Sequence, residues 1–131
     1  MDREIVNPWQ WQDQYGFVQA NALTGAERVV LCAGQTSVDA EGAPLHAGDM
    51  RAQVGRALDN LETVLAQAGL GLADVVRLNY YVTDVQAFFG AADLLAERFE
   101  AAGCRPASTL LGVAALAFPE LMVEIEATAA A

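Results

Sequence analysis

The chain has 131 residues, with 17 acidic and 7 basic side chains, and its net charge of −10 at pH 7 argues against a nucleic-acid partner, because phosphates would be repelled. Its length fits a single domain over residues 1–131, no apolar run reaches the ~18 residues of a membrane span, and its start lacks the basic region of a signal peptide. We therefore expect a cytoplasmic protein without a membrane partner. Hydrophobic residues make up 54% of the chain, which favours an oligomer that hides apolar surface; the alternative is that the many alanines are small filler.

Two strands are predicted in the first third of the chain. Residues 17–23 can form one strand and residues 28–33 a second, with a turn around Gly25 between them, so the pair is interpreted as a β-hairpin. Residues 39–42 are expected to form a surface loop. His46 is the only histidine, and its neighbours lack the spacing of metal ligands, so we expect no metal and no cofactor.

Two amphipathic helices are predicted next. Apolar residues recur at steps of three or four from residue 50 to residue 68, with Asp49 as a suitable N-cap and Gly69 placed to end the helix. A second apolar stripe at helical spacing is ended by Gly103. Its members are Phe88, Ala92, Leu95 and Phe99.

Three more strands are predicted, over residues 75–82, 108–113 and 121–129. The last alternates, with Leu121, Val123, Ile125 and Ala127 on one face and Met122, Glu124, Glu126 and Thr128 on the other. The order ββαβαββ predicts an α+β two-layer sandwich, with one mixed sheet and two helices on one of its faces. The other face must be solvated or covered by another subunit, and the hydrophobic content favours a covering subunit.

Six short segments occur in the order and at the spacing typical of one known family. They are Ala33-Gly34-Gln35, Ala68-Gly69, Asp74-Val75-Val76, Tyr81-Val82-Thr83-Asp84, Pro106-Ala107 and Val123-Glu124-Ile125-Glu126-Ala127. Through them the chain resembles the RidA (YjgF) family over residues 16–129. The resemblance implies a chorismate-mutase-like fold, a homotrimer, and small-molecule clefts at the three subunit interfaces. It also implies hydrolysis of reactive enamines and imines of amino acids, the activity of archetypal members.

The resemblance assigns two candidate catalytic positions. The first glutamate of the family's Glu-Ile-Glu segment faces the cleft and orients water, and it is present here as Glu124. Archetypal members carry an arginine directly after the Pro-Ala pair, where it holds the substrate carboxylate, and here that position is Ser108. A serine donates one neutral hydrogen bond and does not replace a bidentate cation. Arg105, three residues earlier, is an alternative source of positive charge.

Four further positions are candidate ligand-binding residues by the same resemblance. Gly34 is shared with the family, whereas Phe17 stands where members have a tyrosine, Ala92 where they have an asparagine, and Leu110 where they have a cysteine. The replacements remove polarity. We therefore expect a neutral ligand that carries a carbonyl, imine or amide group, with Glu124 as a general base on water or as a proton carrier.

Other interpretations remain open at this point. The protein could be a non-catalytic, metabolite-binding trimer, or an archetypal deaminase with a substitute for the arginine. Glu124 could belong to a solvated strand face, and Ser108 could be an ordinary strand residue. The aromatic segment that contains Trp9 and Trp11 could cover the cleft, or it could anchor the N-terminus to the sheet.

Overall fold

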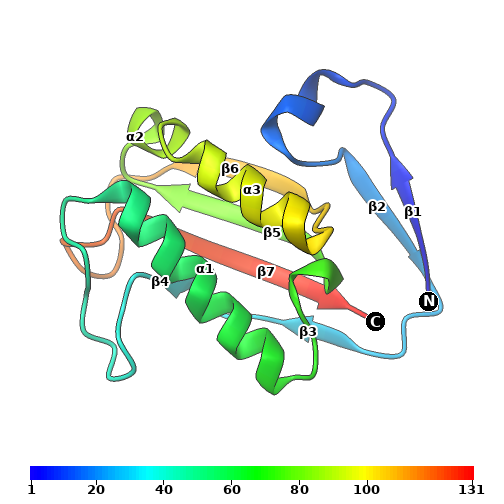
Figure 1. Ribbon diagram of the computed structural model, residues 1–131, viewed down its shortest axis with the longest axis horizontal. Coiled ribbons are helices and arrows are strands. Elements are labelled where there is room, and N and C mark those ends of the chain that lie inside the picture. The colour runs from blue at the N-terminus through cyan, green and yellow to red at the C-terminus, as the bar shows by residue number, and fades with distance from the viewer.

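The computed structural model describes residues 1–131 and has an α+β fold built on a mixed five-stranded sheet (Figure 1). The strand order is β3-β7-β5-β6, and the short strand β4 also pairs with β7. β5 runs antiparallel to β7 and parallel to β6, so β6 is an edge strand. The bounds are Val29–Leu31 for β3, Gln35–Thr36 for β4, Val75–Val82 for β5, Ala107–Gly112 for β6 and Val123–Ala130 for β7.

Three helices cover one face of this sheet (Figure 1): α1 (Met50–Gln67), α2 (Val85–Phe89) and α3 (Ala92–Ala102). The Asp49 side chain caps α1 by accepting a hydrogen bond from the backbone N–H of Ala52 at 3.0 Å, as the sequence predicts. Two short 3₁₀ turns complete the helical elements, η1 (Trp11–Tyr15) and η2 (Leu72–Asp74). None of the helices is long and apolar enough to cross a bilayer.

The second predicted helix is two helices in the structure. α2 begins after Asp84, whose carboxylate accepts a hydrogen bond from the Ala87 N–H at 3.0 Å, and it ends at Gly90. The chain then turns before α3 begins at Ala92. The apolar stripe nevertheless holds, because Phe88, Leu95 and Phe99 are all buried against the sheet. The sequence pattern therefore predicted the buried face correctly and missed the break between the two helices.

The core lies between the helices and the sheet. Leu58, Leu61 and Leu65 of α1 are fully buried, as are Leu78 of β5 and Ile125 of β7. The alternation predicted for the last strand is confirmed. Its apolar members Val123, Ile125 and Ala127 are buried, whereas Glu124 and Thr128 are half-buried and Glu126 is exposed.

The predicted hairpin between residues 17–23 and 28–33 is wrong. β2 (Ala20–Thr24) pairs antiparallel with β1 (Asp2–Val6), and the two form a separate sheet. β3 pairs instead with β7, at the far end of the chain. A local turn signal cannot reveal that both strands have better partners, one of them a polar N-terminal segment without strand-like alternation.

Side-chain bonds to the backbone hold the two-stranded sheet in place. The Arg3 guanidinium donates to the carbonyls of Ala73, Val75 and Arg105, and the Asn21 amide donates to those of Val76 and Arg105. These carbonyls belong to β5 and to the segments that lead into β5 and β6. The N-terminal strands are therefore fixed beside the edge strand β6, and they place η1 above it (Figure 1).

The sheet face opposite the helices is open. It carries the polar side chains of Arg77, Asn79 and Tyr81, together with exposed apolar ones: Leu31 is 78% exposed and Leu111 is 49% exposed. Tyr81 pairs with Leu111 on one side and with Glu124 on the other, so these three side chains share this face. No helix covers this face, and the loop residues Val113, Ala115 and Leu116 border it beside Tyr81 and Glu124.

Candidate functional site

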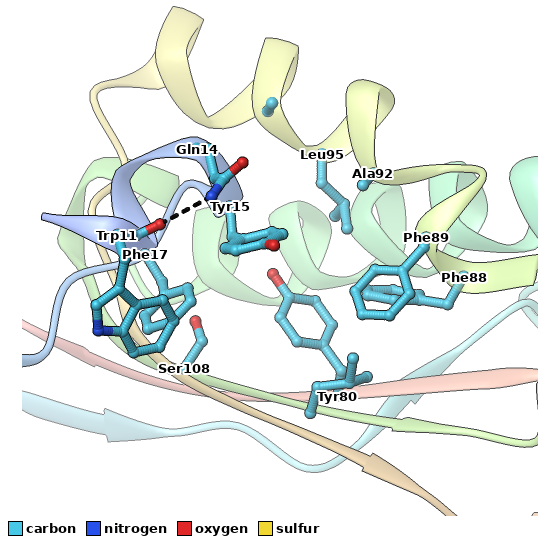
Figure 2. Close-up of a pocket in the computed structure, with 12 residues that line it drawn as sticks. Trp11, Gln14, Tyr15, Phe17, Tyr80, Phe88, Phe89, Ala92, Leu95 and Ser108 are labelled. Carbon is cyan, nitrogen blue, oxygen red and sulfur yellow. Dashed lines mark hydrogen bonds between the residues drawn. The ribbon is translucent and has the colours of Figure 1, made fainter. Parts of the chain in front are cut away.

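A cavity of about 300 Å³ lies on the helix side of the sheet, between η1, β5, β6 and the helices α2 and α3 (Figure 2). Its wall is mostly aromatic and apolar, and no charged side chain belongs to it. The lining residues are Trp11, Gln14, Tyr15, Phe17, Tyr80, Phe88, Phe89, Ala92, Leu95, Ala96, Ser108 and Leu110. The volume is at the lower end of the range of small-molecule sites, which is about 300–1,000 Å³.

The outer wall of the cavity depends on η1 and on the chain that follows it. Gln12 of η1 is fully buried, and its side-chain amide donates to the Trp9 carbonyl at 2.9 Å, while its side-chain oxygen accepts from the Gln19 amide at 3.1 Å. Gly16 has a left-handed backbone (φ 76°), which turns the chain after η1. Phe17 thereby returns to contact Trp11 edge to face, with ring centroids 5.8 Å apart.

The inner wall contains two hydroxyl groups. In β6 the Ser108 Oγ is buried and has no hydrogen-bond partner. The neighbouring strand β5 contributes Tyr80, whose hydroxyl points into the cavity (Figure 2). Burial raises the pKa of the Tyr80 hydroxyl, and the nearby Cys104 raises it further. Both hydroxyls are therefore neutral donors, in a cavity that offers an anion no counter-charge.

A second hollow, of about 320 Å³, lies on the open face of the sheet and is lined partly by Gly34, Tyr81, Glu124 and Glu126. Gly34 makes room for the Glu124 side chain. A Cβ at position 34 would lie 2.7 Å from the Glu124 Cδ and 2.9 Å from its Cγ, and closer still to its Oε1. Because such separations are far below van der Waals contact, any side chain at position 34 would displace the carboxylate.

The two glutamates of this hollow differ in their partners. Glu126 Oε1 accepts hydrogen bonds from the Tyr81 hydroxyl at 2.9 Å and from the Asn79 amide at 3.1 Å. These two bonds, from Asn79 first and then from Tyr81, lower the pKa of Glu126. The Glu124 carboxylate accepts no hydrogen bond within the chain and remains free to bind a water or a ligand.

The structure divides the predicted site residues into two groups. Phe17, Ala92, Ser108 and Leu110 line the aromatic cavity together, whereas Gly34 and Glu124 line the hollow on the open face. The strand register explains the division.

In the parallel pair β5–β6, Ser108 is opposite Leu78, which is buried under the helices. In the antiparallel pair β5–β7, Glu124 is opposite Tyr81, whose side chain is on the open face. Within one chain the sheet therefore separates the candidate base from the candidate pocket.

Sequence reasoning missed several residues of the cavity. Tyr80 lies within the strand predicted over residues 75–82, and a buried strand tyrosine carries no separate sequence signal for a cavity. Of the N-terminal tryptophans, Trp11 lines the cavity whereas Trp9 is not part of the wall. Trp11 lies on η1, and through it this segment forms part of the outer wall of the cavity.

The Arg105 side chain is exposed and lies in a neighbouring hollow, outside the aromatic cavity. Asp13 and Glu100 line the same hollow. Its position therefore does not bring a positive charge to Ser108.

Comparisons with known proteins agree on the family. The family model described as endoribonuclease L-PSP matches residues 14–131. The solved structure of YyfB from Yersinia pestis, a Rid-family protein of unknown function, has a TM-score of 0.88 and 36% identity, and the match covers 100% of both chains. Protein DfrA from Myxococcus xanthus is 32% identical over 116 residues, which are 88% of this chain and 87% of that one. A RutC family protein from Pyrococcus abyssi is 30% identical over 100 residues, 76% of each chain. The chain belongs to the RidA (YjgF) family.

Proposed function

We propose that residues 1–131 form one domain that assembles as a homotrimer, in which each interface joins the aromatic cavity of one subunit to Glu124 and Gly34 of its neighbour. The resulting cleft would bind a neutral small molecule with an imine, enamine or amide group and hydrolyse it. The observation that carries this proposal is the division of the six predicted site residues between two hollows on opposite faces of the sheet. One chain alone cannot present both groups to a single ligand.

The open sheet face supports assembly. Val29 is 60% exposed and Leu31 78% exposed on β3, and Leu111 is 49% exposed on the edge strand β6. Burying such side chains between subunits contributes about 25 cal/mol per Å² of apolar surface removed from water. Among the polar side chains between them, Glu126 is already paired with Asn79 and Tyr81, which lowers the cost of burying it.

The wall of the cavity supports a neutral substrate. A carboxylate would lose its hydration there without gaining a cation, because no charged side chain lines the cavity and Arg105 lies outside it. Position 108, where the family resemblance places an arginine, offers only a neutral hydroxyl. We therefore favour hydrolysis of an uncharged substrate over the archetypal deamination of amino-acid imines, which carry a carboxylate.

Glu124 is the group best suited to activate water. Its carboxylate has no partner within the chain, in contrast to Glu126, and Gly34 leaves it room to move toward a ligand. A carboxylate that accepts a proton from water generates the nucleophile for attack on a C=N or C=O carbon. The proton then passes to the departing nitrogen.

The word endoribonuclease describes the matched family model, and two features of this chain oppose that activity here. The net charge of −10 repels a phosphate backbone, and the aromatic cavity offers it no cation. A single-stranded RNA should therefore bind far more weakly than an uncharged small molecule.

Two measurements test the proposal. Sedimentation should give three times the 13.9 kDa of one chain. A panel of neutral imines, enamines and amides should contain a substrate whose turnover is lost in Glu124→Gln while its binding is kept. Binding without any turnover in the wild-type protein would support a non-catalytic metabolite-binding trimer instead. Rapid hydrolysis of 2-iminopropionate would contradict the neutral substrate and support the archetypal deaminase activity.

A further inference from the structure

The aromatic cavity has the form of a slot between two groups of rings. Trp11 and Phe17 form one group on the outer wall, where they meet at an interplanar angle of 76°. Tyr80 and Phe88 form the other group on the inner wall, with centroids 5.0 Å apart and an interplanar angle of 49°. Tyr15, Phe89, Gln14, Ser108 and aliphatic side chains complete the wall, and the Gln14 amide donates to the Trp11 carbonyl at 3.2 Å. Figure 2 shows the labelled rings facing a common space.

The size of this space fits one small ring system. A dry cavity of about 150 Å³ holds a benzene molecule, and this one measures about 300 Å³. A flat ring gains the offset and edge-to-face contacts that aromatic side chains prefer, at centroid separations of about 4.5–7 Å. A saturated ring of similar volume is thicker and gains no such contacts.

One polar group reaches into the space from the inner wall. The Tyr80 hydroxyl points into the cavity and forms no hydrogen bond with the other lining side chains (Figure 2). The other hydroxyl of the inner wall, Ser108 Oγ, is inaccessible to solvent and has no hydrogen-bond partner. Because burial raises the pKa of Tyr80, its hydroxyl remains a neutral donor at physiological pH.

We infer that the cavity binds an uncharged molecule with one flat aromatic ring, and that the Tyr80 hydroxyl donates a hydrogen bond to an acceptor on that ring's substituent. On the inner wall Tyr80 thus selects ligands by polarity, whereas the surrounding rings select them by shape. The inference rests on the proposed function in treating this cavity as the ligand side of the cleft. It adds the chemical class of the ligand and the residue that recognises it.

The effects of ligand charge and ligand shape on affinity can be measured separately with four probes of similar size. Benzamide carries the ring and a neutral acceptor, benzoate adds a negative charge, benzylammonium adds a positive charge, and cyclohexanecarboxamide replaces the flat ring. Trp11 reports binding by fluorescence in a Trp9→Phe background, since these are the only two tryptophans and Trp9 lies outside the wall. Benzamide should bind at least about tenfold more tightly than each of the other three.

The role of Tyr80 is tested with a matched pair of ligands. Tyr80→Phe keeps the ring and removes only the donor, so benzamide should bind about 3- to 10-fold more weakly, the value of one neutral hydrogen bond. Toluene, which has no acceptor, should bind equally well to both proteins and so reports that the cavity is intact. Reporting from Trp9 in a Trp11→Phe background should show no ligand response.

Three results would overturn the inference: benzoate or benzylammonium binding as tightly as benzamide, cyclohexanecarboxamide binding as tightly, or an unchanged benzamide affinity in Tyr80→Phe. None of these assays requires turnover or Glu124. Tyr80-dependent benzamide binding without any turnover would leave the inference standing and remove the hydrolase. Glu124-dependent turnover without benzamide binding would support the hydrolase and overturn the inference of an aromatic ligand.

Discussion

Replacing Ser108 by alanine tests how the structure treats this position. The Ser108 Oγ is buried and unpartnered, so the folded chain bears the cost of removing a hydroxyl from water without recovering a hydrogen bond. That cost is about 1–3 kcal/mol in proteins. Alanine removes the hydroxyl and keeps the methylene, and it leaves only a small void. The free energy of unfolding should therefore rise by about 1 kcal/mol in Ser108→Ala.

Ser37 provides the matched control. It is also buried, but its Oγ donates to the Leu45 carbonyl at 2.8 Å. Ser37→Ala should lower the free energy of unfolding by about 1 kcal/mol, since it removes a hydrogen bond to the half-buried Leu45 carbonyl. The same substitution should thus change the free energy of unfolding in opposite directions at these two serines.

Thermal unfolding followed by circular dichroism measures both effects. For a chain of this length, 1 kcal/mol corresponds to a shift in Tm of about 3–5 °C. The proteins must be compared at one subunit concentration, because assembly makes Tm depend on concentration. A lower Tm in Ser108→Ala, similar to that in Ser37→Ala, would mean that the Ser108 hydroxyl has a partner and would refute the reasoning.

Three further predictions follow from particular contacts. Gly34→Ala should abolish Glu124-dependent turnover while changing Tm little, because the new Cβ displaces the carboxylate and the backbone at position 34 is not left-handed; unchanged turnover would contradict the assigned role of this glycine. The pKa of Glu126 is lowered in the folded protein, so its contribution to stability is present above the unfolded pKa and is lost as pH falls through the folded pKa. The free energy of unfolding, measured with urea, should accordingly fall less on acidification in Glu126→Gln than in the wild type. Arg3→Ala should weaken ligand binding, because η1 is no longer held above the cavity, whereas Arg51→Ala, which breaks only an exposed ion pair, should leave binding unchanged.

The elements with local signals were predicted well from the sequence. α1 has an N-cap, a regular apolar stripe and a terminating glycine, and β7 has strict alternation, so both follow from short-range rules. The N-terminal strands do not. β1 is held by the Arg3 guanidinium on carbonyls about seventy or more residues away in the chain, and no window of sequence contains that information.

The candidate site was predictable as a set of residues but not as an arrangement. The family resemblance selected positions on both faces of the sheet, and only the register of β5 with its two neighbours shows that Ser108 and Glu124 are on opposite sides. Tyr80 was missed because a buried strand tyrosine has the same sequence signal as a core residue. Its free hydroxyl is visible only once the helices and η1 surround it.

Mixing two inactive variants measures most directly whether the cleft is shared between subunits. Ala92→Trp should fill the aromatic cavity and leave Glu124 intact, whereas Glu124→Gln should remove the base and leave the cavity intact. If each cleft combines two chains, co-refolding the two proteins in equal amounts should restore about a quarter of the wild-type turnover, since a quarter of the interfaces then pair an intact cavity with an intact base. A mixture that stays as inactive as its components, although mixed trimers form, would contradict the account.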